Sequence, residues 1–195
     1  MSQSIAFIGV GNMGCPMAEN LMKANKTVKV FDVSKKMLDI ARDKKLETVS
    51  KLDDLITGDV DTVITMLPEG KHSKEVYLGE KGIINKVSKD CLLIDCSTID
   101  IQTSIEIGNK ASEKQILMID APVSGGVMGA QKATLNIMVG GSKEAFEKAL
   151  PLLKIMGKNI FHAGKLGSGN GAKICNNMAL GIAVSYTHLT LPTKA

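Results

Sequence analysis

The segment GVGNMG, with glycines at positions 9, 11 and 14, constrains the fold of this chain more than any other feature. It follows the apolar run SIAFIG (4–9), which is typical of a buried strand, and it opens a helical pattern over 12–25. In such a strand–turn–helix unit, Gly9 permits a tight turn, Gly11 lets the backbone approach a pyrophosphate, and Gly14 lets helix and sheet pack closely. Backbone amides at the helix start attract the phosphates. The residues predicted to contact the cofactor in this turn are Gly9, Val10, Gly11, Asn12, Met13 and Gly14.

An acidic residue, Asp32, ends the next predicted strand, TVKVFD (27–32). A carboxylate there can accept hydrogen bonds from the ribose hydroxyls of adenosine, and it would repel a 2′-phosphate. Lys35 and Lys36 weaken this preference, because a cation could hold that phosphate. NAD is therefore the expected cofactor and NADP the less favoured one. The alternatives are a strand-end turn residue for Asp32 and a purely structural turn for the glycines.

Apolar runs alternate with helical patterns along the rest of the chain. The further predicted strands are 60–67, 91–97, 116–120, 135–141 and 159–163. Because these runs are apolar throughout, both faces of the sheet must be covered. The predicted fold class is α/β, a Rossmann-type doubly wound, mostly parallel sheet with helices on both faces, followed by the start of a helical second domain. The helix predicted over 142–156 is expected to bend or break at Pro151.

A change in composition divides the chain near its end. Glycines cluster in GKLGSGNG (164–171), which predicts a hinge between a dinucleotide-binding domain over 1–164 and the start of an interdomain helix over 165–184. Beyond Val184 the apolar helical pattern stops, and SYTHLTLPTKA (185–195) is polar, β-branched and interrupted by proline. We therefore expect the helix to end at Val184 and residues 185–195 to be a foreign or artefactual tail.

Charge and hydropathy exclude several classes of protein. The net charge of +4 is mild and the lysines are spread along the chain, which indicates no nucleic-acid partner. No apolar run approaches the roughly 20 residues of a transmembrane helix, so no membrane association is expected. The four cysteines have no metal-binding spacing, and no metal site is predicted. The first strand begins at about Ser4, which leaves no room for a targeting segment, so a cytoplasmic location is expected.

Two further segments carry candidate chemistry. In DAPVSGGVMGA, the residues Ser124, Gly125 and Gly126 could form a concavity of amides and a hydroxyl suited to a carboxylate, although a structural loop is the alternative. In GSGNGAKICNN, Lys173 and Asn177 are four residues apart and share a helical face. A partly desolvated lysine has a pKa lowered toward neutrality, which suits general acid–base work. On its position alone, however, this lysine would be interpreted as a surface residue near a helix start.

The segments GVGNMGCPMAENL, DAPVSGGVMGA and GSGNGAKICNN, in this order, resemble the β-hydroxyacid dehydrogenase family from residue 4 to about residue 184. The resemblance implies NAD(P)-dependent oxidation of a short 3-hydroxy acid, such as 3-hydroxyisobutyrate, to its semialdehyde. It implies that Lys173 is the catalytic acid/base with Asn177 beside it, and that Ser124, Gly125 and Gly126 hold the substrate carboxylate. The further cofactor contacts that it implies are Leu67, Pro68, His72 and Thr98.

Some residues depart from the family pattern. His72 stands where relatives carry Asn, and Ala133 stands where they usually carry Gly, which we interpret as a mild change. Asn176 is interpreted as a packing or capping residue. The family implies a homo-oligomer, which we expect to be compromised here, and a helical second domain without which Lys173 would lie in an open, wet cleft.

Two alternatives to this function remain open. One is a related enzyme that acts on tartronate semialdehyde or 2-(hydroxymethyl)glutarate. The other, of a different class, is a catalytically inert dinucleotide-binding fragment.

Overall fold

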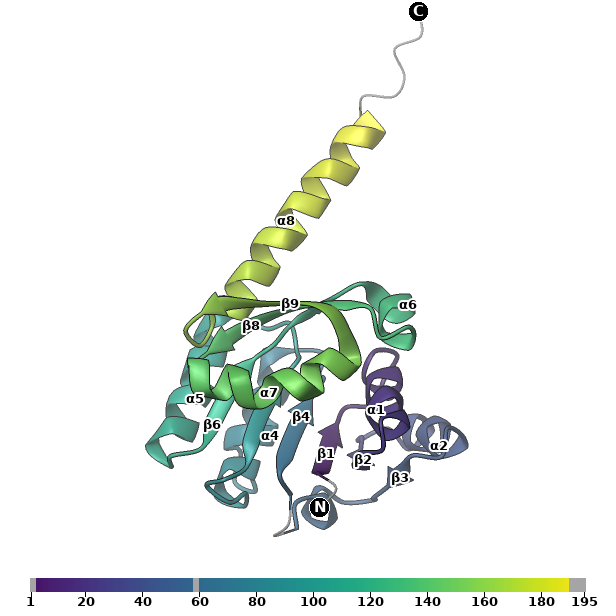
Figure 1. Cartoon of the computed structure of the whole chain (residues 1–195), viewed down its shortest axis with the longest axis vertical. Coiled ribbons are helices and arrows are strands. Elements are labelled where there is room, and N and C mark those ends of the chain that lie inside the picture. The colour runs from purple at the N-terminus through teal and green to yellow at the C-terminus, as the bar shows by residue number, and fades with distance from the viewer. Residues whose placement is uncertain (1–2, 58–59, 190–195) are drawn as a thin grey trace, which may run out of the picture.

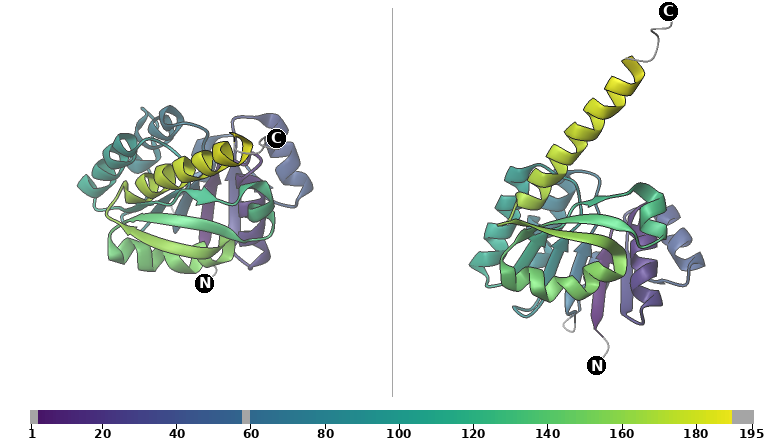
Figure 2. Two further views of the ribbon diagram at one scale, coloured as in Figure 1. Left: turned by 90° about the horizontal axis from the view of Figure 1, so that it is seen from above. Right: turned by 45° about the horizontal axis from the view of Figure 1, so that its top comes forward.

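The computed structural model describes residues 3–57 and 60–189, with side chains described as far as Ser185. In this part of the chain the strands form one nine-stranded sheet, with helices on both of its faces (Figures 1 and 2). The strands are β1 (Ser4–Ile8), β2 (Thr27–Phe31), β3 (Glu47–Thr48), β4 (Thr62–Thr65), β5 (Leu92–Asp95), β6 (Leu117–Asp120), β7 (Val123–Ser124), β8 (Leu135–Gly141) and β9 (Gly157–Gly164). The helices are α1 (Gly14–Lys23), α2 (Lys35–Asp43), α3 (Leu52–Leu55), α4 (Gly70–Leu78), the 3₁₀ helix η1 (Ile83–Asn85), α5 (Ile101–Glu113), α6 (Gly126–Gln131), α7 (Lys143–Met156) and α8 (Ser168–Leu189).

The strand order is β3-β2-β1-β4-β5-β6-β8-β7, and β9 pairs with β8 off this path. The six strands from β3 to β6 are parallel, whereas β8 runs antiparallel to β6 and to β7. The chain moves outward from β1 to β3 and then returns to place β4 on the other side of β1. This reversal between β1 and β4 opens a crevice at the carboxyl ends of the strands, where α/β sheets bind ligands.

The two faces of β1 show why the sheet is covered on both sides. Ile5 and Phe7 belong to a buried cluster that includes side chains of α1, α2 and α7. Ala6 and Ile8 point the other way and belong to a second cluster with side chains of α3, α4 and α5. Successive residues of a strand alternate between its faces, so a strand that is apolar at every position is buried on both. The predicted fold class is confirmed.

Helix α8 projects away from the rest of the molecule (Figure 1), as expected for a helix that begins a second domain. Its apolar side chains are largely uncovered, and Met178 and Ile182 are 62% and 67% exposed. The prediction that the helix ends at Val184 is wrong, because α8 continues to Leu189. The predicted foreign tail at 185–195 lies partly outside the described residues, and its origin stays a prediction.

Two other expectations are corrected by the structure. Helix α7 runs unbroken through Pro151, so the expected break is absent, while the alternative of a bend stays a prediction. The buried Leu152 and Leu153 that follow the proline belong to the core cluster on this side of the sheet. Ala133 is not a mild replacement for glycine, since its φ of 55° lies in the left-handed region that a Cβ disfavours.

Candidate functional site

The turn between β1 and α1 requires its glycines for two different reasons. Gly9 has a φ of 91°, and a Cβ at this position would collide with the carbonyl oxygen of Met66. A Cβ on Gly14 would collide with the carbonyl oxygen of Gly9, so only glycine lets α1 begin this close to the strand. A Cβ on Gly11, in contrast, would meet no described atom within 4 Å. Gly11 therefore faces open space at a helix start, which is the cradle that a phosphate group needs.

A cavity of about 500 Å³ lies at the carboxyl ends of β1, β2 and β4, where the strand order reverses. This volume falls within the range of small-molecule sites. The predicted cofactor residues that line the cavity are Gly9, Gly11, Asn12, Met13, Gly14, Asp32, Leu67, Pro68 and His72. The other two lie elsewhere, since Val10 is fully buried and Thr98 is exposed just beyond the end of β5.

Two backbone amides hold the carboxylate of Asp32 at the end of β2. The N–H of Val10 donates to its Oδ2 at 2.9 Å, and the N–H of Ser34 donates to its Oδ1 at 2.8 Å. The carboxylate is half-buried and lines the cavity. Val10 therefore contributes to this region by orienting Asp32 and not by lining the cavity.

The opposite wall of the cavity comes from the segment after β4 and from α4. Leu67 and Pro68 lie on this wall beside His72, whose side chain is half-buried. The Nδ1 atom of His72 is buried and has no hydrogen-bond partner among the described residues. An unpaired buried polar atom is costly, and a bound ligand would supply the partner that this nitrogen lacks. Together with the open side of Gly11, it shows that the cavity residues fit a dinucleotide.

The predicted carboxylate-binding segment joins β7 to α6. Gly125 and Gly126 have φ values of 132° and 63°, which turn the chain sharply after Ser124. The Oγ atom of Ser124 accepts a hydrogen bond of 3.5 Å from Nδ2 of Asn176 on α8. The structure thus brings Asn176 to this segment, whereas the sequence pattern indicated only packing or capping. Asn177, the predicted partner of the lysine, is exposed on α8.

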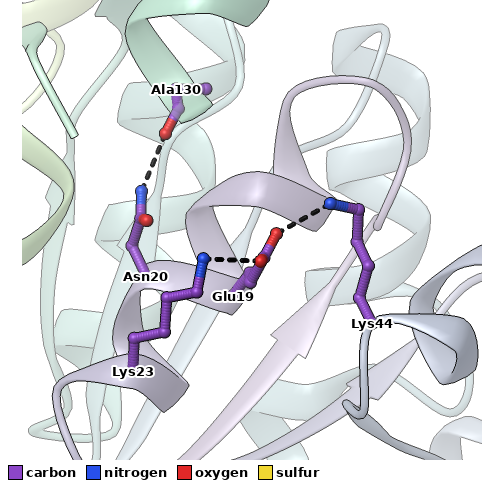
Figure 3. A network of polar contacts seen from close by, with 5 residues as sticks. All are labelled: Glu19, Asn20, Lys23, Lys44 and Ala130. Atoms are coloured by element: carbon purple, nitrogen blue, oxygen red, sulfur yellow. Dashed lines mark hydrogen bonds and ion pairs between the residues drawn. The ribbon is translucent and has the colours of Figure 1, made fainter. Parts of the chain in front are cut away.

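Helix α6 is attached to the helix that follows the glycine turn (Figure 3). Nδ2 of Asn20 on α1 donates to the carbonyl oxygen of Ala130 on α6 at 2.7 Å. Beside it, Glu19 pairs with Lys23 at 2.6 Å and with Lys44 at 2.8 Å, and these hydrogen bonds lower the pKa of the Glu19 carboxyl. The predicted cofactor turn and the predicted substrate segment are therefore connected through α1.

Lys173 lies on the second turn of α8 and is only 7% exposed. The expectation that it lies in an open, wet cleft is wrong for this structure. Burial lowers the pKa of its ammonium group below the ordinary value, because removal from water disfavours the charged form. This is the direction that a general base requires.

A buried network anchors the start of α8 to the sheet. The carboxylate of Asp120, at the end of β6, accepts hydrogen bonds of 2.7 Å from the N–H groups of Gly167 and Asn170. The side chain of Asn170 accepts a bond of 3.0 Å from the N–H of Ile99 and donates one of 2.9 Å to Ser104. Burial raises the pKa of Asp120, and the hydrogen bonds from these backbone amides oppose the rise.

Sequence reasoning missed both Asp120 and Asn170. Each stands inside a segment that was recognised, at the start of DAPVSGG and in the middle of GSGNGAK. The family resemblance of these segments implied a role for Lys173 but carried no signal for the residues that orient its helix.

Within residues 3–57 and 60–189, no set of three or more His, Cys, Asp or Glu side chains is arranged to hold a metal ion. In the same residues, no helix combines the length and the hydropathy that a membrane-spanning segment requires.

Comparisons with known proteins agree with this geometry. The model of the NAD-binding domain of 6-phosphogluconate dehydrogenase matches residues 4–164. A 3-hydroxyisobutyrate dehydrogenase of Pseudomonas aeruginosa is 46% identical over 183 residues, which are 94% of this chain and 61% of that protein. An NAD-dependent L-serine dehydrogenase of the same organism is 43% identical over 95% of this chain and 62% of its own length.

Among solved structures, Mycobacterium tuberculosis 3-hydroxyisobutyrate dehydrogenase with L-serine has a TM-score of 0.89 and 37% identity. The match covers 96% of this chain and 64% of that one. The chain thus spans somewhat less than two thirds of the length of these relatives, and the resemblance to β-hydroxyacid dehydrogenases is confirmed. The chain belongs to the family of the NAD-binding domain of 6-phosphogluconate dehydrogenase.

Proposed function

We propose that this chain supplies the NAD-binding part of a dehydrogenase that oxidises 3-hydroxyisobutyrate, or a similar short 3-hydroxy acid, to its semialdehyde. In this proposal residues 1–164 are the cofactor domain and 165–184 begin the catalytic helix. The observation that carries the proposal is that Lys173 lies on α8 between two residues, Asn170 and Asn176, that contact the rest of the domain. Asn170 bonds to the backbone beside Thr98, and Asn176 bonds to Ser124.

These contacts support separate roles for the residues at the two ends of this stretch of α8 and for Lys173 between them. The proposed nicotinamide-side residue and the proposed carboxylate-side residue lie near opposite ends of one short stretch of helix, with Lys173 between them. Neutral Lys173 would accept the hydroxyl proton as the C–H bond breaks and the carbonyl forms. When bound, the nicotinamide would supply the hydride acceptor. The protein's contribution is the alignment of the two reacting groups and the tuning of the lysine pKa.

NAD is the proposed cofactor because of Asp32. Its carboxylate is fixed by two amides at the edge of the cavity, where it can pair with ribose hydroxyls and repel a 2′-phosphate. Titration of NAD and NADP into the chain and into Asp32→Asn tests this preference. We expect the wild-type chain to bind NAD more tightly and the variant to lose most of the difference. Equal affinities in the wild-type chain would contradict the proposal.

L-Serine is a second candidate substrate. A relative named as an L-serine dehydrogenase is 43% identical to this chain, and the similar solved structure contains L-serine. Serine is itself a short 3-hydroxy acid, so the same alignment of carboxylate, hydroxyl and lysine would serve it. The other candidates are the related enzymes that act on tartronate semialdehyde or 2-(hydroxymethyl)glutarate, and a catalytically inert dinucleotide-binding fragment.

Calorimetry and a turnover assay on the same samples separate these possibilities. NAD binding is measured by titration, and NADH formation is followed with 3-hydroxyisobutyrate and with L-serine. The test variant is Lys173→Ala, and the matched control is Lys165→Ala, which removes an exposed lysine close to α8. Turnover lost only in Lys173→Ala supports the enzyme, while binding without turnover in every sample supports the inert fragment. Absence of NAD binding in the wild-type chain would refute both.

A further inference from the structure

The cavity wall formed by β4 and α4 is held from behind by a buried polar network. Asp32 lies on the β2 side of the glycine turn, so the adenosine half of a dinucleotide belongs on that side. Strands β4 and β5 lie on the other side of β1, so the other half belongs toward the ends of these strands, where the wall with Leu67 and Pro68 begins. The glycine turn lies against this wall at Met66 and Leu67, and the polar network holds the wall from the side of β5.

Ser97 ties this wall to the neighbouring strand. Its side chain is fully buried, and its Oγ atom accepts a hydrogen bond of 2.8 Å from the backbone N–H of Leu67. Its own backbone N–H donates to Oδ1 of Asp95 at 2.9 Å. The segment after β4 and the segment after β5, which leads to Thr98, are therefore joined through one serine.

Asp95 is the centre of the network. It is 1% exposed at the end of β5, and its Oδ1 atom also accepts a bond of 2.8 Å from Oγ1 of Thr65. The same Thr65 oxygen lies 2.8 Å from the hydroxyl of Tyr77 on α4, the helix that carries His72. One carboxylate thus connects the ends of β4 and β5 with α4.

The network is costly for the fold. The second carboxyl oxygen, Oδ2 of Asp95, is buried and makes no hydrogen bond in the described part of the chain, although the buried hydroxyl of Ser73 on α4 is near enough to lower the pKa of this carboxyl. Burial raises the pKa of Asp95, and the hydrogen bonds from Ser97 oppose the rise. Apolar residues of similar volume would fill this space without the desolvation cost, so the polar groups are better explained by the geometry that they impose.

We propose that Ser97 and Asp95 are positioning residues that set the cavity wall for the nicotinamide half of the dinucleotide. This inference rests on the proposed dinucleotide binding. Loss of the network should therefore weaken the binding of the nicotinamide half and leave the binding of the adenosine half unchanged.

Two ligands that differ only in the nicotinamide group test whether the effect is confined to that half. NAD and ADP-ribose share the adenosine and pyrophosphate groups, and ADP-ribose lacks the nicotinamide. For Ser97→Ala and Thr65→Val we expect NAD affinity to fall about tenfold, while ADP-ribose affinity stays within about twofold of the wild-type value. Asp95→Asn keeps an oxygen acceptor at the same place and should retain most of the NAD affinity.

Thr62→Val is the matched control. Thr62 is a fully buried threonine on the same strand, and its hydroxyl bonds to Gln3 at the opposite end of the sheet. This variant should leave the ratio of the two affinities unchanged. The inference is overturned if Ser97→Ala and Thr65→Val weaken both ligands by the same factor, or weaken neither. If Ser97→Ala does not fold, Thr65→Val decides alone. If the wild-type chain binds neither ligand, the proposed function itself fails.

Discussion

The side chain of Asn170 accepts a 3.0 Å hydrogen bond from the backbone N–H of Ile99, across a separation of 71 residues in sequence. This bond attaches the helix that contains Lys173 to the segment that contains Thr98. The same asparagine is fully buried, and its backbone N–H is bonded to Asp120. The start of α8 is therefore fixed on the sheet before any second domain contributes a contact.

Replacement of Asn170 should loosen this attachment. Asn170→Ala leaves the N–H of Ile99 and the hydroxyl of Ser104 without their partner, so the free energy of unfolding should fall by about 1–3 kcal/mol. Hydrogen exchange should also show faster exchange of the Ile99 amide. Asn159→Ala is the control, because Asn159 is exposed and the one described hydrogen bond of its side chain is to the side chain of Asn136. Equal losses in the two variants would contradict the anchoring role.

The sequence predicted the parts of this site that depend on local spacing. The glycine turn and Asp32 each stand at a fixed distance from a strand end, and such distances are visible in a linear pattern. Lys173 is indicated only by the resemblance of three segments in order to a known family. The bond between Asn170 and Ile99 is not visible in this way, because it joins segments that meet only after the sheet has formed.

The errors in the fold prediction have similar causes. Pro151 breaks a helix only where packing does not hold both sides of it, and the buried Leu152 and Leu153 supply that packing. Local composition predicts a helix end at Val184, yet α8 continues past it. Local propensity is a weak guide where tertiary contacts or helix continuation decide the outcome.

Ala133 offers a direct test of backbone strain. Its φ of 55° places a Cβ in a conformation that costs about 1–2 kcal/mol for most residues. Ala133→Gly should therefore raise the free energy of unfolding by up to about 1 kcal/mol after the greater chain entropy of glycine is subtracted. Ala24→Gly is the control, since Ala24 has a φ of −85° and should lose stability on the same change. Chemical denaturation measures both, and a loss of stability in Ala133→Gly would contradict the assignment of strain.

The contact between Asn20 and Ala130 should stabilise α6. Asn20→Ala leaves the carbonyl oxygen of Ala130 without this donor, so stability should fall by about 1 kcal/mol and amides of α6 should exchange faster. Lys23→Ala removes one of the two ion pairs of Glu19 and leaves the pair with Lys44, so stability should change by no more than about 0.5 kcal/mol. Equal losses of unfolding free energy in Asn20→Ala and Lys23→Ala would contradict the stabilising role of the hydrogen bond between Asn20 and Ala130.

Asp95 predicts a particular dependence of stability on pH. Its folded-state pKa is raised by burial, so the folded protein keeps this proton above the ordinary Asp pKa of about 3.9. Over that window the unfolded chain binds fewer protons, and stability falls as pH rises from about 4 to the folded-state pKa. Asp95→Asn lacks this loss, so its stability relative to wild type should increase across the window. Denaturation curves at several pH values measure the difference, and a difference that does not change with pH would contradict the raised pKa.

In the proposed function, the cavity at the ends of β1, β2 and β4 binds NAD, and a substitution at Gly11 tests this binding. A Cβ on Gly11 meets no described atom, so Gly11→Ala should leave the melting temperature unchanged while its methyl group occupies the space proposed for the pyrophosphate. Gly181→Ala is the control, because a Cβ there also meets no described atom and Gly181 lies far along α8. In calorimetric titrations with NAD, the account predicts binding to the wild-type chain and to Gly181→Ala, and affinity reduced about tenfold or more in Gly11→Ala, a loss of at least about 1.4 kcal/mol. Equal NAD affinity in all three proteins, or no binding to the wild-type chain, would contradict it.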